Sequence, residues 1–316
     1  MTIRKSWILF FSFFIMIQIA GLLKSTRAQS FSHLNLDPKR VSWSELLYKV
    51  KNFTAEVNTR VQLESLPTAE VEASLIKSSQ GVPIAVSRPE SYKISVHRVV
   101  DSIFSAPVTS ISQVWFNPQN ASALGRVRLR VGKNDFKKIY RFTDRGVFRH
   151  RREPKDRQEV SKQPEQWTDV RDTFYTHNLE KLGCPNVTER LVLIYIISAA
   201  ELSEGMQPLS FCVFGRRQLF HIQLKSGGLH SLKVDYIEKG HQGEVRRQGK
   251  VEALKIDLAI QPLPSDLDED EDFSFLGFET DIAIFIDPAS NLPIQLSGKI
   301  PNVGNSTVKL HQVQLR

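Results

Sequence analysis

The stretch IFIDPASNLPIQLSGKIP, residues 284–301, shows most clearly how this chain folds. Apolar residues stand at alternate positions before Asp287 and again after Pro293. This spacing indicates two β-strands, because alternate side chains of a strand face the same side. Asp287–Pro288 and Asn291 lie between the two segments and are typical turn residues. We therefore expect two antiparallel strands that are neighbours in one sheet.

Strand-like alternation continues along the chain on both sides of this pair. The further segments are residues 53–63, 69–75, 92–96, 113–116, 126–131, 136–142, 146–151, 170–175, 209–214, 218–225, 229–238, 252–261 and 307–315. Short turns join most of them, and the glycines at 227–228 and 240–243 predict hairpins. Short turns favour antiparallel pairing. The expected fold is mainly β (β-rich α+β): a long curved antiparallel sheet or half-open barrel with one or two short packed helices.

Two segments have helical features instead. Residues 42–50 carry apolar side chains at positions 43, 46, 47 and 50 behind a serine, which predicts a short helix. The apolar run in residues 188–202 follows Thr188 and predicts a helix buried on most sides. Residues 153–166 are charged, contain two prolines and are predicted to be a loop. So few helices argue against a doubly wound nucleotide-binding fold.

The chain opens with an apolar segment. Arg4 and Lys5 precede an uncharged run over residues 7–23, and Thr26 and Ala28 are small residues at its polar end. This order is typical of a secretory signal, so residues 1–28 are predicted to be a signal peptide. The run falls just short of the about 20 apolar residues that cross a membrane. An uncleaved N-terminal anchor is the alternative. The rest, residues 29–316, is expected to be a single exported domain in the periplasm, with no integral membrane span.

Charge is distributed unevenly along the chain. After residue 28 it carries 38 Lys and Arg against 34 Asp and Glu, a formal charge of +4, which does not indicate binding to nucleic acid. Residues 126–162 hold fourteen basic residues against five acidic ones, whereas six of the seven residues 266–272 are acidic. The two blocks could pair, but we expect the acidic block to be a solvated loop.

The basic stretch supplies the candidate binding residues. Over residues 126–131 arginine alternates with apolar residues, which places three guanidinium groups on one face of a strand. A guanidinium group binds phosphate or carboxylate through its planar fork. The anion-binding candidates are Arg126, Arg128, Arg130, Arg145, Arg149, Arg151 and Arg152. The alternative is that these side chains form a solvated outer face that keeps the protein soluble.

The chain has two cysteines, Cys184 and Cys212. An exported chain meets an oxidising compartment, where such a pair can form a disulfide. This bridge would stabilise the fold by about 3 kcal/mol on the chain-entropy model. The alternative is that both are small buried apolar residues.

Residues for catalysis or metal binding form no recognisable pattern. The eight histidines have no metal-ligand spacing, and no Gly-x-Ser-x-Gly elbow marks a nucleophile. Phosphate-loop and dinucleotide fingerprints are absent. Residues 266–270 begin like a calcium loop, but Glu271 and Gly277 stand where an EF-hand needs glycine and glutamate. We therefore predict no catalytic residue, no metal and no cofactor.

Four stretches resemble a known family. They are YRFTDRGVFRHRREP (140–154), PLSFCVFGRRQLFHIQL (208–224), LKVDYIE (232–238) and the stretch 284–301. They are similar to a bacterial family of exported proteins labelled domain of unknown function 3108, over about residues 92–315. That family resembles, more distantly, the curved-sheet periplasmic carriers of lipoproteins. The resemblance implies a family-like curved sheet over residues 91–316 and brings no active-site residues with it. Residues 29–90 are predicted separately as an N-terminal helix and hairpin.

These features give three hypotheses on function, in this order. The first is a non-catalytic binding or carrier module for lipid or an anionic component of the cell envelope. The second is a structural or assembly protein that contacts other envelope proteins through exposed strand edges. The third is a hydrolase whose catalytic residues are dispersed in the sequence.

Overall fold

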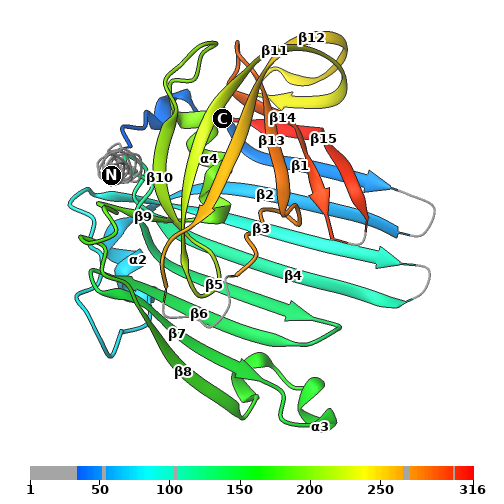
Figure 1. Cartoon of the computed structure of the whole chain (residues 1–316). Helices are drawn as coiled ribbons and strands as arrows, with labels where there is room; N and C mark the ends of the chain where they lie inside the picture. Colours follow the sequence, from blue (N-terminus) through cyan, green and yellow to red (C-terminus); the bar gives the residue numbers. More distant parts are fainter. Residues whose placement is uncertain (1–33, 52–54, 103–104, 266–270, 302) are drawn as a thin grey trace, which may run out of the picture. The chain divides into compact units, whose positions relative to one another are not determined.

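Fifteen strands form one continuous sheet (Figure 1). The computed structural model describes residues 34–51, 55–102, 105–265, 271–301 and 303–316. These residues belong to one compact unit, Phe31–Arg316. The strands are β1 (Trp43–Lys51), β2 (Ala55–Pro67), β3 (Glu90–Ser102), β4 (Ser105–Phe116), β5 (Ala123–Val131), β6 (Phe136–Thr143), β7 (Gly146–Glu153), β8 (Asp169–Thr176), β9 (Val187–Glu189), β10 (Leu209–Phe214), β11 (Leu219–Gly240), β12 (Gly243–Pro262), β13 (Thr280–Asp287), β14 (Leu292–Ile300) and β15 (Gly304–Leu315). The mainly β fold with few short helices is confirmed. The predicted signal peptide, residues 1–28, lies outside the described residues.

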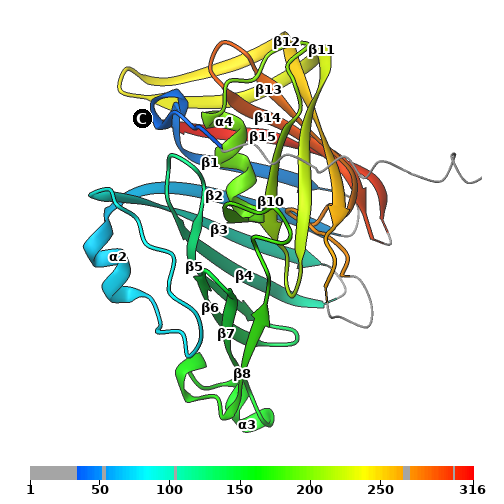
Figure 2. The same ribbon diagram turned by 60° about the vertical axis from the view of Figure 1, so that its left-hand side comes forward.

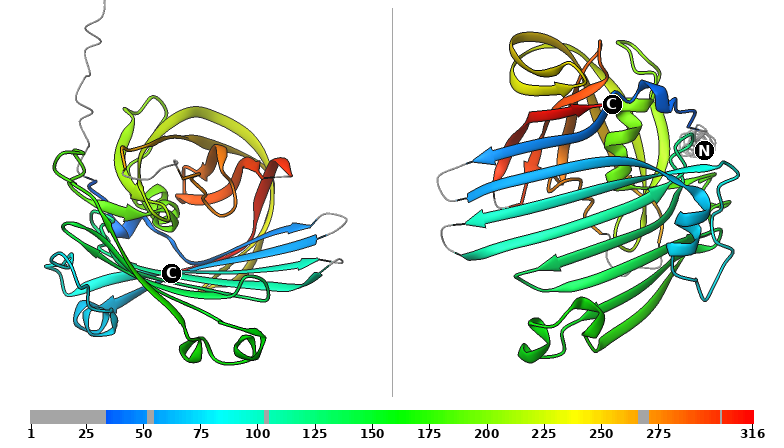
Figure 3. Two further views of the ribbon diagram at one scale, coloured as in Figure 1. Left: turned by 60° about the horizontal axis from the view of Figure 1, so that its bottom comes forward. Right: turned by 180° about the vertical axis from the view of Figure 1, so that it is seen from behind.

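The sheet has two parts that share β15. Strands β11 to β15 close into a five-stranded ring, because β11 pairs with β15 as well as with β12 (Figure 3). Strands β1 to β8 extend from β15 as a curved wing in which each strand pairs antiparallel with the next. Two pairings are parallel, β9 with β10 and β11 with β15, so the sheet is mixed rather than purely antiparallel.

Short helices complete the fold. They are the 3-10 turns η1 (Pro38–Arg40), η2 (Pro164–Gln166) and η3 (Arg190–Val192), and the α-helices α2 (Thr68–Ser74), α3 (Arg157–Val160) and α4 (Leu193–Ala199). None of the helices in the described ranges is long and apolar enough to cross a membrane. The segment predicted as one loop, residues 153–166, contains α3 and η2.

Helix α4 lies on the concave side of the wing (Figure 2). We call this side of the wing the inner face. Every residue of α4 is buried, as its unbroken apolar sequence predicts. Its polar groups are satisfied by the sheet and its loops: Trp43 Nε1 donates to Ser198 Oγ at 2.9 Å, and the Tyr195 hydroxyl donates to the Pro118 carbonyl at 2.6 Å. The predicted helix 188–202 is shorter in the structure, because Val187–Glu189 pairs with β10 as strand β9.

Three local predictions were wrong, and each has a physical reason. Residues 42–50 form strand β1, where a bulge between Trp43 and Glu45 leaves Trp43 and Leu46 both fully buried although they are three residues apart, a helix-like spacing. Residues 69–75 are mostly helix α2, because alanine and glutamate favour a helix there and β2 pairs with β3 instead.

The third error concerns the glycine pair at 227–228. It is a bulge inside the single long strand β11 rather than a hairpin turn, and Gly228 has a φ of +80°. The hairpin turn predicted at residues 240–243 is present, with Gly240 opposite Gly243.

Candidate anion-binding site

The arginines of β5 lie on the inner face of the wing. Strand register places Arg128 beside Ser112 of β4 and Lys138 of β6, and Lys138 beside Arg151 of β7. A parallel row places Arg126 beside Tyr140, and Tyr140 beside Arg149. Tyr140 packs against Phe214 of β10, with ring centroids 6.3 Å apart, so both rows face the interior.

Arg126 serves the structure rather than a ligand. Its side chain is 1% exposed, and its Nη1 lies 2.7 Å from Glu189 Oε1. The same Nη1 also donates to the Gly215 carbonyl at 3.3 Å. Arg190 Nε lies 3.7 Å from the same carboxylate oxygen, so two buried guanidinium groups share one buried acid. This ion pair ties β5 to β9 across the inner face.

The half-buried cations that remain on the inner face form the basic cluster, which we define as Arg98, Arg128, Arg130, Lys138, Arg149 and Arg151. All six are half-buried. Within the described part of the chain, no hydrogen bond or ion pair involves the side chains of Arg98, Arg128, Arg130 or Lys138. Arg149 donates to the Thr173 hydroxyl at 2.9 Å, and Arg151 pairs with Glu153.

Aromatic rings occupy the positions where counter-ions would be expected. The Arg128 guanidinium carbon lies 5.4 Å from the Phe136 ring centroid, and Lys138 Nζ lies 4.1 Å from the same centroid. The Arg149 guanidinium carbon lies 5.2 Å from the Tyr175 centroid. Cation–π contacts of this kind stabilise a cation by about 0.5–2 kcal/mol. Arg128 and Lys138 therefore lie against an aromatic ring rather than against a carboxylate.

Burial and the repulsion of neighbouring cations lower the pKa values of three members of the cluster, Arg98, Arg128 and Lys138. Burial, and then the charge of Arg126, lowers the pKa of Arg128 to about 10. Burial, and then the charge of Arg128, lowers the pKa of Lys138 to about 8. A bound anion would offset both effects, because an opposite charge nearby favours the protonated form.

The predicted anion-binding residues do not all lie in one cluster. Arg128, Arg130, Arg149 and Arg151 belong to the basic cluster, whereas Arg126 is buried with Glu189. Two other predicted candidates lie elsewhere. Arg145 is exposed in the turn between β6 and β7. Arg152 points from the outer face of β7 and donates to the carbonyl oxygens of Glu165, at 2.9 Å, and Trp167, at 3.4 Å.

Sequence reasoning missed Arg98 and Lys138, although a signal was present. Arg98 continues the parity of Tyr92, Ile94 and Val96, whose side chains are among the buried residues of β3. Lys138 has the parity of Phe136 and Tyr140, which are buried too. A cation on the parity of a buried apolar run points inward, and this criterion would have found both residues.

A groove of about 430 Å³ lies on the outer face of β6 to β8. Its charged groups contact one another. His150 Nδ1 lies 2.7 Å from Asp172 Oδ1, Arg152 Nε lies 3.1 Å from His150 Nε2, and Lys137 pairs with Glu165. These charges are largely compensated, so the groove is a weaker candidate for an anion than the basic cluster.

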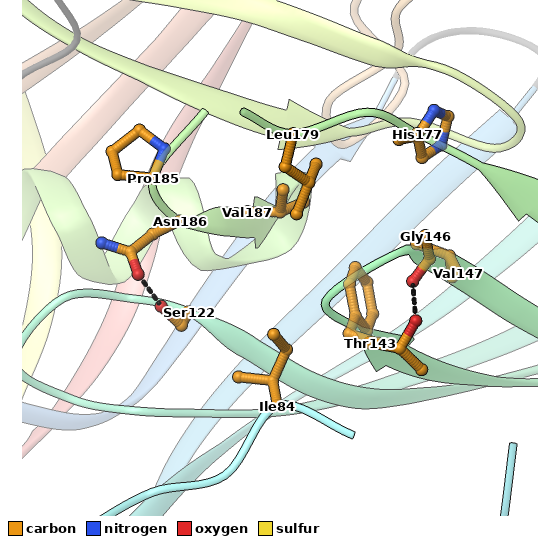
Figure 4. A pocket seen from close by; sticks show the side chains of 11 residues that line it. Ile84, Ser122, Thr143, Gly146, Val147, His177, Leu179, Pro185, Asn186 and Val187 are labelled. Carbon is orange, nitrogen blue, oxygen red and sulfur yellow. Dashed lines mark hydrogen bonds between the residues drawn. The ribbon is translucent and has the colours of Figure 1, made fainter. Parts of the chain in front are cut away.

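A smaller cavity of about 30 Å³ lies beside the turn between β6 and β7 (Figure 4). Polar groups in its wall are paired. Ser122 Oγ donates to Asn186 Oδ1 at 3.0 Å, and Thr143 Oγ1 donates to the Gly146 carbonyl at 2.9 Å. The cavity has room for about one water, so it offers no ligand site.

The acidic block reaches the interior at its C-terminal end. Glu271 is buried and accepts the backbone N–H groups of Arg216, at 2.5 Å, and Arg217, at 2.6 Å. This carboxylate fixes the turn between β10 and β11 opposite the inner face. The expectation of a fully solvated acidic loop is therefore wrong for Glu271, and residues 266–270 lie outside the described residues.

Cys184 and Cys212 are joined by a disulfide, which fastens the loop before β9 to β10. In the described ranges, no group of three or more His, Cys, Asp and Glu side chains is placed to hold a metal ion. Comparison of the chain with family models, with curated proteins and with solved structures finds no match. The family resemblance drawn from residues 140–154, 208–224, 232–238 and 284–301 thus stays a prediction.

Proposed function

We propose that this protein is a non-catalytic binding module of the cell envelope, which holds a phosphate- or carboxylate-bearing ligand in the basic cluster. The observation that carries the proposal is Arg128. Its guanidinium group is half-buried beside Arg126 and has no acceptor in the described ranges. A cation in this setting destabilises the fold unless an anion binds, and perturbed groups of this kind are typical of functional sites.

The compartment belongs to the same proposal. The apolar leader over residues 1–28 predicts export, and the envelope is rich in phosphate and carboxylate groups on lipids and polysaccharides. Fusing residues 1–28 to alkaline phosphatase, which is active only after export, tests the compartment. An inactive fusion would contradict it.

Binding is tested with inorganic pyrophosphate as the probe, by titration calorimetry on the purified domain. Arg128→Gln is expected to weaken binding about tenfold or more, since one charge-assisted contact contributes about 1.5–3 kcal/mol. Arg88→Gln is the matched control, because Arg88 is exposed in the loop before β3 and its loss changes the net charge equally. Equal affinities of wild type and Arg128→Gln, or no binding at millimolar pyrophosphate, would refute the proposal.

One observation favours the second candidate, an assembly protein. In the part of the chain that the structure describes, residues 243–252 of β12 pair with β11 alone, since β13 reaches β12 only from Leu254 onward. Free strand edges invite pairing with another chain. Crosslinking in the envelope at Val245, which is 48% exposed, would capture a partner strand if this function holds. Absence of any crosslinked partner would count against it.

A further inference from the structure

A cavity of about 60 Å³ lies between the first strands of the wing and the ring. Its walls come from β1, β2, β14 and β15 and from the segment before β13, and they are almost wholly apolar. Val57, Leu276, Phe278 and Val308 represent these walls. Among the described residues, the single charged group that lines it is Arg98. An arginine at an otherwise apolar cavity needs a reason, because burying its charge is costly.

Arg98 joins this cavity to the basic cluster. Its neighbour across β4 on the inner face is Arg130, since both residues lie opposite Ser110. Burial, and then the charge of Arg130, lowers the pKa of Arg98. Its buried Nε has no partner in the described ranges. The half-buried guanidinium groups of Arg98 and Arg130 therefore lie on either side of Ser110, with no acidic residue between them in this row.

The position of Arg98 is fixed by the segment that covers it. Gly277 approaches the guanidinium so closely that a Cβ at this position would lie 2.9 Å from Arg98 Nη1. Gly277 also has a φ of +96°, a conformation that other residues rarely adopt. Gly277 therefore packs against the guanidinium of Arg98, which lines the apolar cavity.

We infer that the ligand of this protein is an amphiphile, whose anionic head binds between Arg98 and Arg130 and whose alkyl chain enters the cavity lined by Val57 and Phe278. This inference rests on the proposed function and names the ligand class for the same site. Charge complementarity selects the head, and the apolar walls select the chain. A free phosphate ion would use the arginines and leave the cavity unused.

The cavity volume sets a quantitative expectation. About 60 Å³ holds about two methylene groups, if each takes about the 30 Å³ share of a water molecule. Burial of one methylene strengthens binding about fourfold. Affinity should therefore rise steeply over the first two carbons of a chain that extends beyond the head, and more slowly after that.

The test is a series of n-alkyl phosphates, with inorganic phosphate as the zero-carbon member, titrated into the wild-type domain below their micelle concentrations. The inference predicts a gain of about fourfold per carbon at the start of the series. Binding of phosphate with no dependence on chain length would overturn the amphiphile and leave the anion-binding function standing. Failure of every member, pyrophosphate included, would refute the proposed function itself.

Two variants test where the alkyl chain and the anionic head of the ligand bind. Val57→Thr keeps the shape of the cavity wall but makes it polar, and it should reduce the gain per carbon to less than twofold. Val245→Thr, on the exposed part of β12, is the matched control and should keep the wild-type series. Arg98→Gln should weaken every alkyl phosphate about tenfold. If Val57→Thr keeps the wild-type gain in affinity per carbon, or if Arg98→Gln keeps the wild-type affinities, the ligand binds elsewhere and the inference is overturned. Urea unfolding confirms that each variant is folded.

Discussion

The inner and outer faces of β7 both carry basic residues, but the two faces differ in the acidic and carbonyl groups that surround those residues. On the outer face, His150 lies against Asp172, and Arg152 donates to two carbonyl oxygens. On the inner face, Arg149 and Arg151 belong to a cluster with more cations than acids. The difference lies in the acceptors: the basic residues of the outer face have acceptors beside them, whereas the inner-face cluster includes Arg128 and Lys138, for which the described ranges supply no hydrogen bond or ion pair.

The largest expected effect comes from Glu189, a fully buried acid of β9 that pairs with Arg126 of the inner face. Glu189→Gln would leave Arg126 and Arg190 without their carboxylate, and breaking a buried ion pair costs about 3–5 kcal/mol. Urea unfolding at pH 7 measures the loss. The control on the outer side is Glu165→Gln, which removes the exposed partner of Lys137 and should change stability little. A loss below about 1 kcal/mol for Glu189→Gln would break the contrast between the faces.

Two further variants should change the free energy of unfolding in opposite directions. Arg128→Met removes a charge that the fold leaves uncompensated and keeps most of the side-chain volume. We expect the free energy of unfolding to rise by about 1 kcal/mol, as replacement of poorly compensated buried charges often stabilises. Arg152→Met on the outer face should lower it by about 1 kcal/mol, because its hydrogen bonds to main-chain carbonyls are lost. If both variants lose stability alike, Arg128 is compensated and the comparison fails.

The pH dependence of stability sharpens the comparison through Lys138. Its pKa in the folded protein is about 8, below the ordinary 10.5. Between these values the unfolded chain binds more protons, so the free energy of unfolding rises with pH. From pH 7 to pH 10 the wild type should gain about 1 kcal/mol relative to Lys138→Met, an amount discounted for partial exposure. Parallel pH profiles of the two proteins, measured by urea unfolding, would contradict the lowered pKa.

The smallest effect is expected on the outer face. Asp172→Asn removes the carboxylate beside His150, where the Asp172 side chain is 58% exposed. Exposed ion pairs contribute at most about 0.5–1 kcal/mol, so we expect a change near the lower end of that range or below. Thermal unfolding in low and high salt measures it. A loss above about 2 kcal/mol would show that the outer groove is also a strongly coupled site.

Most strands could be predicted from the sequence because a period of two residues survives wherever one side of a strand is buried. Two of the three failures occurred at bulges in a strand, and the third was helix α2. The bulge near Trp43 gave β1 a helix-like spacing, and the bulge at Gly227–Gly228 made one strand look like two. Pairing across the sheet decides these cases, and a single segment does not contain that information.

The candidate site could be predicted only in part. Alternation showed that Arg126, Arg128 and Arg130 share a face, but it did not show which face is inward. Only the register with Lys138 and the packing of Tyr140 on Phe214 settle that question. The difference between Arg126, paired with Glu189, and Arg128, which has no acceptor in the described ranges, depends on a contact between distant strands and left no trace in the local sequence.

The position of β15 has a consequence for how the protein is made. This strand bonds to β14, β1 and β11, and it pairs Trp43 with Leu315. Contacts between such distant segments form late, because the loop between them must first be closed. Synthesis must therefore reach β15 before the ring can close and before β1 can pair on both of its edges. Until then the edge of β1 stays unpaired, and an unpaired strand edge makes incomplete chains prone to aggregate.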